Sequence, residues 1–92
     1  MSDKKLTAII VDDEEKAISN LKKLLGLYCG SIQVVDTAVG SEPAISLINT
    51  IKPDVVFLDI AMPKRNGFEM LHMLDIIPLI VFVTAHEKYA LN

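Results

Sequence analysis

The sequence predicts an α/β fold in which one parallel β-sheet carries helices on both faces. Short apolar runs rich in β-branched residues occur four times, and stretches with the helical spacing of apolar residues separate them. The connections between these segments are short, which favours right-handed crossovers and a doubly wound parallel sheet. Residues 1–92 are predicted to form one domain, because the chain is too short for two.

Composition narrows the class of protein further. Hydrophobic residues make up 51% of the chain and charged residues 23%, which excludes an intrinsically disordered chain. The longest apolar run, 76–83, is far shorter than the roughly 20 residues of a membrane span. Cys29 is the only cysteine, so a secreted disulfide scaffold is excluded and the cytoplasm is the expected compartment. A net charge of −3 argues against direct nucleic-acid binding.

The first strand is predicted over 6–11, a near-continuous apolar run typical of a strand covered on both faces. From Glu14 the period changes to that of a helix, and Gly30 supplies a stop signal. The apolar stripe of this helix is expected to be buried and comprises Ala17, Ile18, Leu21, Leu24, Leu25 and Tyr28.

The second strand is predicted over 32–35 and is followed by a second helix. Ser41 is a favourable N-cap, and Pro43 is tolerated in the first turn. The helix is expected to bury Ala44, Ile45, Ile48 and Ile51, and to close at Lys52-Pro53.

The third strand, 55–58, leads directly into Asp59 and then into a turn that contains Pro63, Asn66 and Gly67. A third helix is expected to bury Phe68, Leu71 and Leu74. The fourth strand, 79–83, ends at Thr84, and a final short helix is expected over about 87–92.

Three acidic residues follow predicted strands directly. Asp12 and Asp13 end the first strand and Asp59 ends the third, so a parallel sheet brings them to one edge. Three close carboxylates repel one another, and a Mg²⁺ ion removes that conflict because it prefers oxygen ligands. One carboxylate is then available as a nucleophile toward phosphorus, and Thr84 adds a hydroxyl at the same edge.

A simpler interpretation also fits these acids. An acid at the end of a strand often caps the following helix. Capping of the helix that starts near Glu14 is therefore an alternative role for Asp12 or Asp13.

Three motifs resemble the receiver domain of two-component response regulators. They are 9–14 (IIVDDE), 56–63 (VFLDIAMP) with Asn66 and Gly67, and 81–85 (VFVTA). The segment 84–91 (TAHEKYAL) is most similar to receivers that precede a LytTR-type DNA-binding domain. The resemblance spans essentially all 92 residues, with the motifs in the family's order.

The resemblance implies a flavodoxin-like sheet with strand order 2-1-3-4 and a role for each site residue. Asp59 would accept the phosphoryl group. Asp12, Asp13, Asp59 and the backbone carbonyl of Ala61 would hold Mg²⁺, and Thr84 would be the switch hydroxyl. The donor would be a sensor histidine kinase and the downstream output DNA binding, so the domain is expected to be a signalling module and not a dedicated enzyme.

Receivers of this family continue beyond the fourth strand to a fifth strand, a lysine at its carboxyl end and a fifth helix. The sequence stops before these elements, so it is expected to be a receiver truncated before the fifth strand. The fourth strand would then be a bare apolar edge, and self-association through that edge is the expected consequence.

Other functions compete with phosphoacceptance. A pseudo-receiver that serves only as an interaction or dimerisation module would keep the fold, and the missing lysine favours it. A phosphatase of the haloacid-dehalogenase type would need a second Asp two residues after the nucleophile, where this chain has Ala61. Direct nucleic-acid binding lacks a basic patch.

Overall fold

The computed structural model describes residues 5–60, 62 and 67–83. Four strands form one parallel sheet in the order β2-β1-β3-β4, as predicted. The elements follow one another along the chain as β1 (Leu6–Asp12), α1 (Glu15–Tyr28), β2 (Ile32–Val39), α2 (Ser41–Ile51), β3 (Val55–Asp59), α3 (Gly67–Leu71) and β4 (Leu79–Val83). Thr84 and the helix expected over 87–92 lie outside the described residues.

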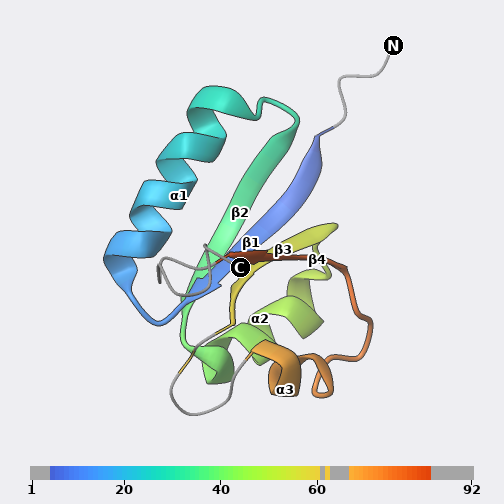
Figure 1. Cartoon of the computed structure of the whole chain (residues 1–92). Coiled ribbons are helices and arrows are strands. Elements are labelled where there is room, and N and C mark those ends of the chain that lie inside the picture. The colour runs from blue at the N-terminus through green and yellow to red at the C-terminus, as the bar shows by residue number, and fades with distance from the viewer. Residues whose placement is uncertain (1–4, 61, 63–66, 84–92) are drawn as a thin grey trace.

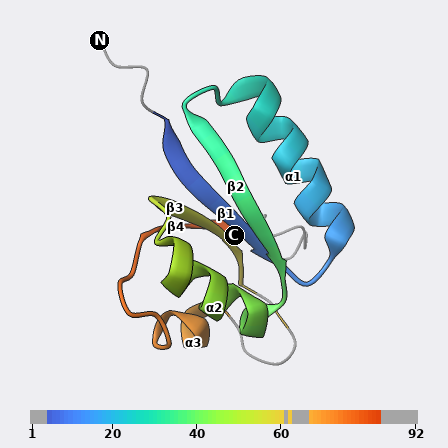
Figure 2. The same cartoon turned by 180° about the vertical axis from the view of Figure 1, so that it is seen from behind.

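The sheet is the middle layer of the molecule. Helix α1 covers one face, and α2 and α3 cover the other, as both views show (Figures 1 and 2). Side chains of β1 alternate between the two layers, with Ile9 and Val11 facing α2 and α3 and Ile10 facing α1. This alternation explains why β1 is apolar throughout its centre, as expected for a strand with both faces covered.

A hydrogen-bonded clamp fixes the amino ends of the three neighbouring strands. The backbone N–H and hydroxyl of Thr7 on β1 donate to the Asp54 carboxylate at 2.8 and 3.1 Å. The backbone N–H of Asp54 donates to the Thr7 hydroxyl at 3.0 Å, and that of Leu79 donates to the Asp54 carbonyl at 3.2 Å. These bonds link β1, β3 and β4 at their amino ends.

Strand β2 extends to Val39, four residues beyond the predicted end at Val35. The polar residues Asp36 and Thr37 interrupt the apolar pattern, so the sequence did not indicate that the strand continues through them. Polar side chains are tolerated there because β2 lies at the edge of the sheet. An irregularity in the β1–β2 register between Ala8 and Ile9 accommodates one extra residue of β2.

Several residues predicted to be buried are exposed. Leu24 and Tyr28 on α1 are 51% and 78% exposed, because the helix lies over β1 and β2 and its remaining flank has no layer above it. Ile51 ends α2 and is also exposed. Phe68 on α3 is 53% exposed, and its ring contacts that of Phe82 on β4 at a centroid distance of 4.8 Å.

The N-cap of α2 also differs from the prediction. Gly40 occupies the cap with φ +96°, a backbone conformation that favours glycine, and Ser41 is the first helical residue. The Ser41 side chain is consequently buried at the start of the helix.

We expect Ile48→Ala to destabilise the fold by about 2–5 kcal/mol. Ile48 is 1% exposed in the cluster between α2 and the sheet, so the substitution leaves a cavity there. Urea unfolding followed by circular dichroism measures the change. Ile51→Ala, on the exposed end of the same helix, is the control and is expected to cost less than about 1 kcal/mol. Equal losses for both variants would contradict this packing.

Candidate functional site

The parallel register brings two acids to one edge of the sheet. Val11 of β1 pairs with Leu58 of β3, so the residues that follow them, Asp12 and Asp59, end neighbouring strands side by side. Asp13 comes directly after β1. Carboxylate oxygens of these three acids all lie within 4.8 Å of one another. The sequence-based prediction of a three-carboxylate cluster is therefore met by the geometry.

The three acids differ in their surroundings. Asp59 is 4% exposed, Asp12 is partly buried and Asp13 is exposed. The cluster therefore combines one buried carboxylate with one that is partly buried and one that is open to solvent. Oxygen ligands at this spacing suit a hard divalent cation such as Mg²⁺.

The capping alternative is met only in part. The Oδ1 atom of Asp12 accepts a hydrogen bond from the backbone N–H of Glu14 at 3.0 Å, just before α1 begins. The N-cap of α1 is Glu14, whose side chain makes no capping hydrogen bond. Asp12 thus has a local structural bond and still contributes an oxygen to the cluster.

Burial raises the pKa of Asp12 from its usual 3.8 to about 6. The negative charges of Asp59 and Asp13 add to this effect, whereas the hydrogen bond from Glu14 opposes it. In the absence of a cation, the cluster therefore holds a proton on Asp12 in mildly acidic solution.

This pKa predicts how pH affects the stability of the metal-free chain. The folded state binds the Asp12 proton more tightly than the unfolded state, so stability falls as pH rises from about 4 to about 6. Asp12 is only partly buried, and after allowance for solvent screening we expect Asp12→Asn to stabilise the chain at pH 7.5 by about 1 kcal/mol. Urea unfolding with a chelator present measures the difference, which should vanish near pH 4. A variant less stable at pH 7.5 would contradict the prediction.

Backbone contacts shape the loops around the cluster. The N–H of Gly40 donates to the Asp12 carbonyl at 2.9 Å, and the N–H of Gly67 donates to the Ile60 carbonyl at 3.1 Å. A Cβ atom at Gly67 would lie 3.2 Å from the Asp59 carbonyl oxygen and 3.1 Å from a Leu58 methyl group. A side chain there would have to displace its neighbours by a few tenths of an ångström, because α3 begins against the backbone of the buried acid.

Two site residues implied by the resemblance, Ala61 and Thr84, lie outside the described residues, as does Pro63.

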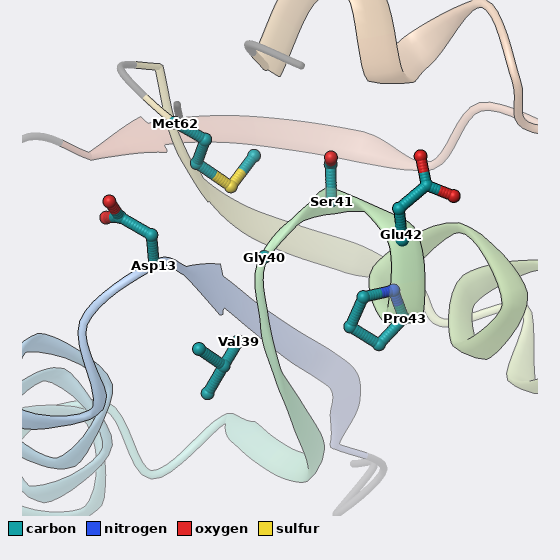
Figure 3. Close-up of a pocket in the computed structure, with 7 residues that line it drawn as sticks. All are labelled: Asp13, Val39, Gly40, Ser41, Glu42, Pro43 and Met62. Atoms are coloured by element: carbon teal, nitrogen blue, oxygen red, sulfur yellow. The ribbon is translucent and has the colours of Figure 1, made fainter. Parts of the chain in front are cut away.

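The structure adds a feature that sequence reasoning missed. A cavity of about 290 Å³ adjoins Asp13, and Ser41 and Met62 are among the residues that line it (Figure 3). Ser41 carried only a helix-capping signal in the sequence, so nothing pointed to its place in a cavity wall.

Fold and site together define a class: an α/β protein whose parallel sheet carries a carboxylate cluster at its carboxyl edge. Residues 8–92 match the response regulator receiver domain family. The chain belongs to this family, which is a family of signalling domains. Among the described residues, no helix is long and apolar enough to cross a bilayer.

Curated relatives agree with the family. The chain is 47% identical over 89 residues to an uncharacterized response regulatory protein of Vibrio parahaemolyticus, a match covering 95% of this chain and 36% of the relative. It is 37% identical over 90 residues to the positive alginate biosynthesis regulatory protein of Pseudomonas aeruginosa, with 95% and 36% covered. The chain thus spans little more than a third of the length of these relatives.

Solved structures share the fold. The response regulator domain of Thermotoga maritima CheB matches with a TM-score of 0.80 and 26% identity, covering 89% of this chain and 62% of that one. A chain of the CheX-CheY-BeF3-Mg²⁺ complex from Borrelia burgdorferi matches with a TM-score of 0.76 and 26% identity, covering 94% and 66%.

Proposed function

We propose that this chain is the phosphoaccepting receiver of a two-component response regulator, with Asp59 as the nucleophile. The supporting observation is the position of Asp59, buried at the carboxyl end of β3 with two further carboxylates within 4.8 Å. In the proposed step, a carboxylate oxygen of Asp59 bonds to phosphorus as the P–N bond of a phosphohistidine breaks. The imidazole nitrogen of the donor keeps the bonding electron pair and takes up a proton.

Mg²⁺ is the proposed cofactor, and it would offset negative charge on the phosphoryl oxygens. Asp12, Asp13 and Asp59 would hold the ion, with the Ala61 carbonyl as a further oxygen ligand and Thr84 as the switch hydroxyl. A matched solved structure contains Mg²⁺ and BeF3 by its description, which supports this cofactor for the present chain. The donor would be a sensor histidine kinase.

The proposed output is a change in a DNA-binding segment of a longer protein. The chain covers 37% of the Salmonella typhimurium relative described as transcriptional regulatory protein BtsR, to which it is 42% identical over 89 residues. Transcriptional regulation through a LytTR-type segment is the proposal that the 84–91 motif supports.

The test is phosphoryl uptake from a small acyl-phosphate donor with Mg²⁺, measured by intact mass spectrometry. One adduct per chain, lost when Mg²⁺ is chelated, is the expected result. No adduct at any donor concentration would overturn phosphoacceptance and promote the alternative, an interaction module that keeps the receiver fold.

One observation favours that alternative. In the described part of the chain, β4 pairs only with β3, and its Leu79, Val81 and Phe82 side chains are 64%, 37% and 39% exposed. An apolar edge strand of this kind pairs readily with another chain. The 92-residue chain is therefore proposed to self-associate through β4.

We expect the chain to run as a dimer or larger species in light scattering at tens of micromolar, and Val81→Lys to shift it toward the monomer. Lysine on an edge strand opposes pairing between sheets. Val35→Lys, on the opposite edge strand β2, should leave the size unchanged. A monodisperse wild-type monomer would contradict self-association.

A further inference from the structure

Gly40 joins β2 to α2 in a single residue. Strand β2 ends at Val39 and α2 begins at Ser41, so the chain turns from strand to helix at Gly40 (Figure 3). The φ of 96° and ψ of 164° at this residue lie in a backbone region that essentially only glycine adopts. Among the described residues, only its chain neighbours have heavy atoms within 4 Å of the point that a Cβ atom would occupy. The backbone conformation, and not a lack of space, therefore opposes an L side chain here.

The amide of Gly40 holds the end of β1. Its N–H donates to the carbonyl oxygen of Asp12 at 2.9 Å. The pairing of β1 with β3 reaches Val11, whereas the pairing of β1 with β2 continues to Asp12. The bond from Gly40 therefore closes the β1–β2 ladder and holds the peptide group that joins Asp12 to Asp13.

That peptide group lies between two acids of the cluster. Because a peptide is planar, its orientation sets ψ of Asp12 and φ of Asp13 and thus how their two carboxylates stand relative to each other. The Oδ1 atom of Asp12 is held separately by the N–H of Glu14 at 3.0 Å. One bond to the backbone and one to the side chain thus locate Asp12 in the cluster, whose carboxylate oxygens lie within 4.8 Å of one another.

Helix α2 is fixed in place by its packing and cannot follow a change in the turn. Ala44 and Ile48 are 0% and 1% exposed in the cluster between α2 and the sheet. Movement of the helix would disrupt this closely packed layer. A residue that requires a negative φ at position 40 must therefore rotate the turn itself, including the N–H that bonds Asp12.

We propose that Gly40 is a positioning residue for the Mg²⁺ ligands Asp12 and Asp13, and that it acts through its N–H bond to the Asp12 carbonyl. The inference rests on the proposed function, which makes these acids ligands of the ion. Loss of a group that holds a metal ligand in place typically lowers metal affinity by about 10–100-fold. Gly40 thus contributes to Mg²⁺ affinity without contacting the ion.

The first test is the Mg²⁺ affinity of Gly40→Ala, measured by isothermal titration calorimetry at pH 7.5. We expect binding about tenfold weaker than that of the wild type. Gly30→Ala adds the same methyl group in equally open space without a positive φ and should bind as the wild type. Ile48→Ala, which loses stability away from the turn, should also keep the wild-type affinity. Circular dichroism confirms that each variant is folded under the conditions of the titration.

Two synthetic forms separate the backbone conformation from the N–H donor, and ligation at Cys29, the only cysteine, gives access to both. Gly40→D-Ala keeps the N–H and favours a positive φ, so it should restore the wild-type affinity. An ester in place of the Gly40 amide removes only the donor and should bind Mg²⁺ as weakly as Gly40→Ala. In the metal-free chain, the ester should shift the amide signals of Asp13 and Glu14, whereas Gly40→D-Ala should leave them in place.

Wild-type Mg²⁺ affinity in the ester form, or equal losses in Gly40→Ala and Gly40→D-Ala, would overturn the positioning role. Either result beside a normal phosphoryl adduct on the wild type leaves the proposed function standing. The expected pattern of affinities without any adduct would overturn phosphoacceptance and support the positioning role. A wild-type chain that binds no Mg²⁺ would overturn both.

Discussion

Asp59→Asn is expected to abolish the phosphoryl adduct formed with an acyl-phosphate donor and Mg²⁺. Asparagine keeps the size of the side chain, but its amide is a far weaker nucleophile than a carboxylate. Asp59 is 4% exposed at the end of β3, so a substitution that keeps the size of the side chain and removes its charge tests the chemistry with little change in packing. Intact mass spectrometry of wild type and variant in parallel measures the difference.

Asp36→Asn is the matched control. Asp36 lies on β2 of the same sheet, is exposed and is not part of the cluster, so this variant should form as much adduct as the wild type. Proteolysis of the wild-type adduct should place the phosphoryl group on the peptide that contains Asp59. An adduct of full intensity on Asp59→Asn, or one on a histidine or serine peptide, would refute the assignment.

A local bond at the start of the helix and membership of an acidic cluster were both open interpretations of these acids, and the structure shows that Asp12 has both. Asp12 bonds the N–H of Glu14 through one oxygen, which is the local role that spacing alone predicts. The register of β1 with β3 adds the non-local role, because it places Asp12 beside Asp59 despite 46 intervening residues. The proximity of Asp12 and Asp59 was predictable from the sequence, because parallel strands end at the same edge of a sheet and both acids end a strand.

The sequence was less informative where burial depends on the extent of the sheet. Helical spacing correctly placed Ile18 and Leu25 of α1 in the core, but it also included Leu24 and Tyr28, which are exposed. Periodicity gives the direction in which a side chain points and not how far the neighbouring layer reaches. The same reason explains Phe68, which covers Phe82 at the border of the sheet.

The cavity was not predictable because its shape depends on backbone angles. A serine before a helical stretch favours an N-cap, and Ser41 fits that pattern. The positive φ of Gly40 moves the cap one residue earlier and turns Ser41 inward. One residue of displacement thus changes an expected surface cap into a buried residue that lines the cavity.

Magnesium binding should depend on all members of the cluster. We expect Asp12→Asn and Asp13→Asn each to lower Mg²⁺ affinity by at least about tenfold, because each removes a charged oxygen ligand. Isothermal titration calorimetry measures the affinity, and the rise of melting temperature with Mg²⁺ provides a second readout. At 100 times its dissociation constant, Mg²⁺ should stabilise the folded chain by about 2.7 kcal/mol.

The same binding should weaken in acid, because the raised pKa of Asp12, about 6, makes the ion compete with a proton. At pH 5 about one chain in ten has Asp12 ionised, so the apparent affinity should be about tenfold lower than at pH 7.5. Asp12→Asn removes this competition and should bind Mg²⁺ weakly with little dependence on pH over that range. Asp36→Asn should retain the wild-type profile. Mg²⁺ affinity that is independent of pH in the wild type would show that Asp12 is not a ligand.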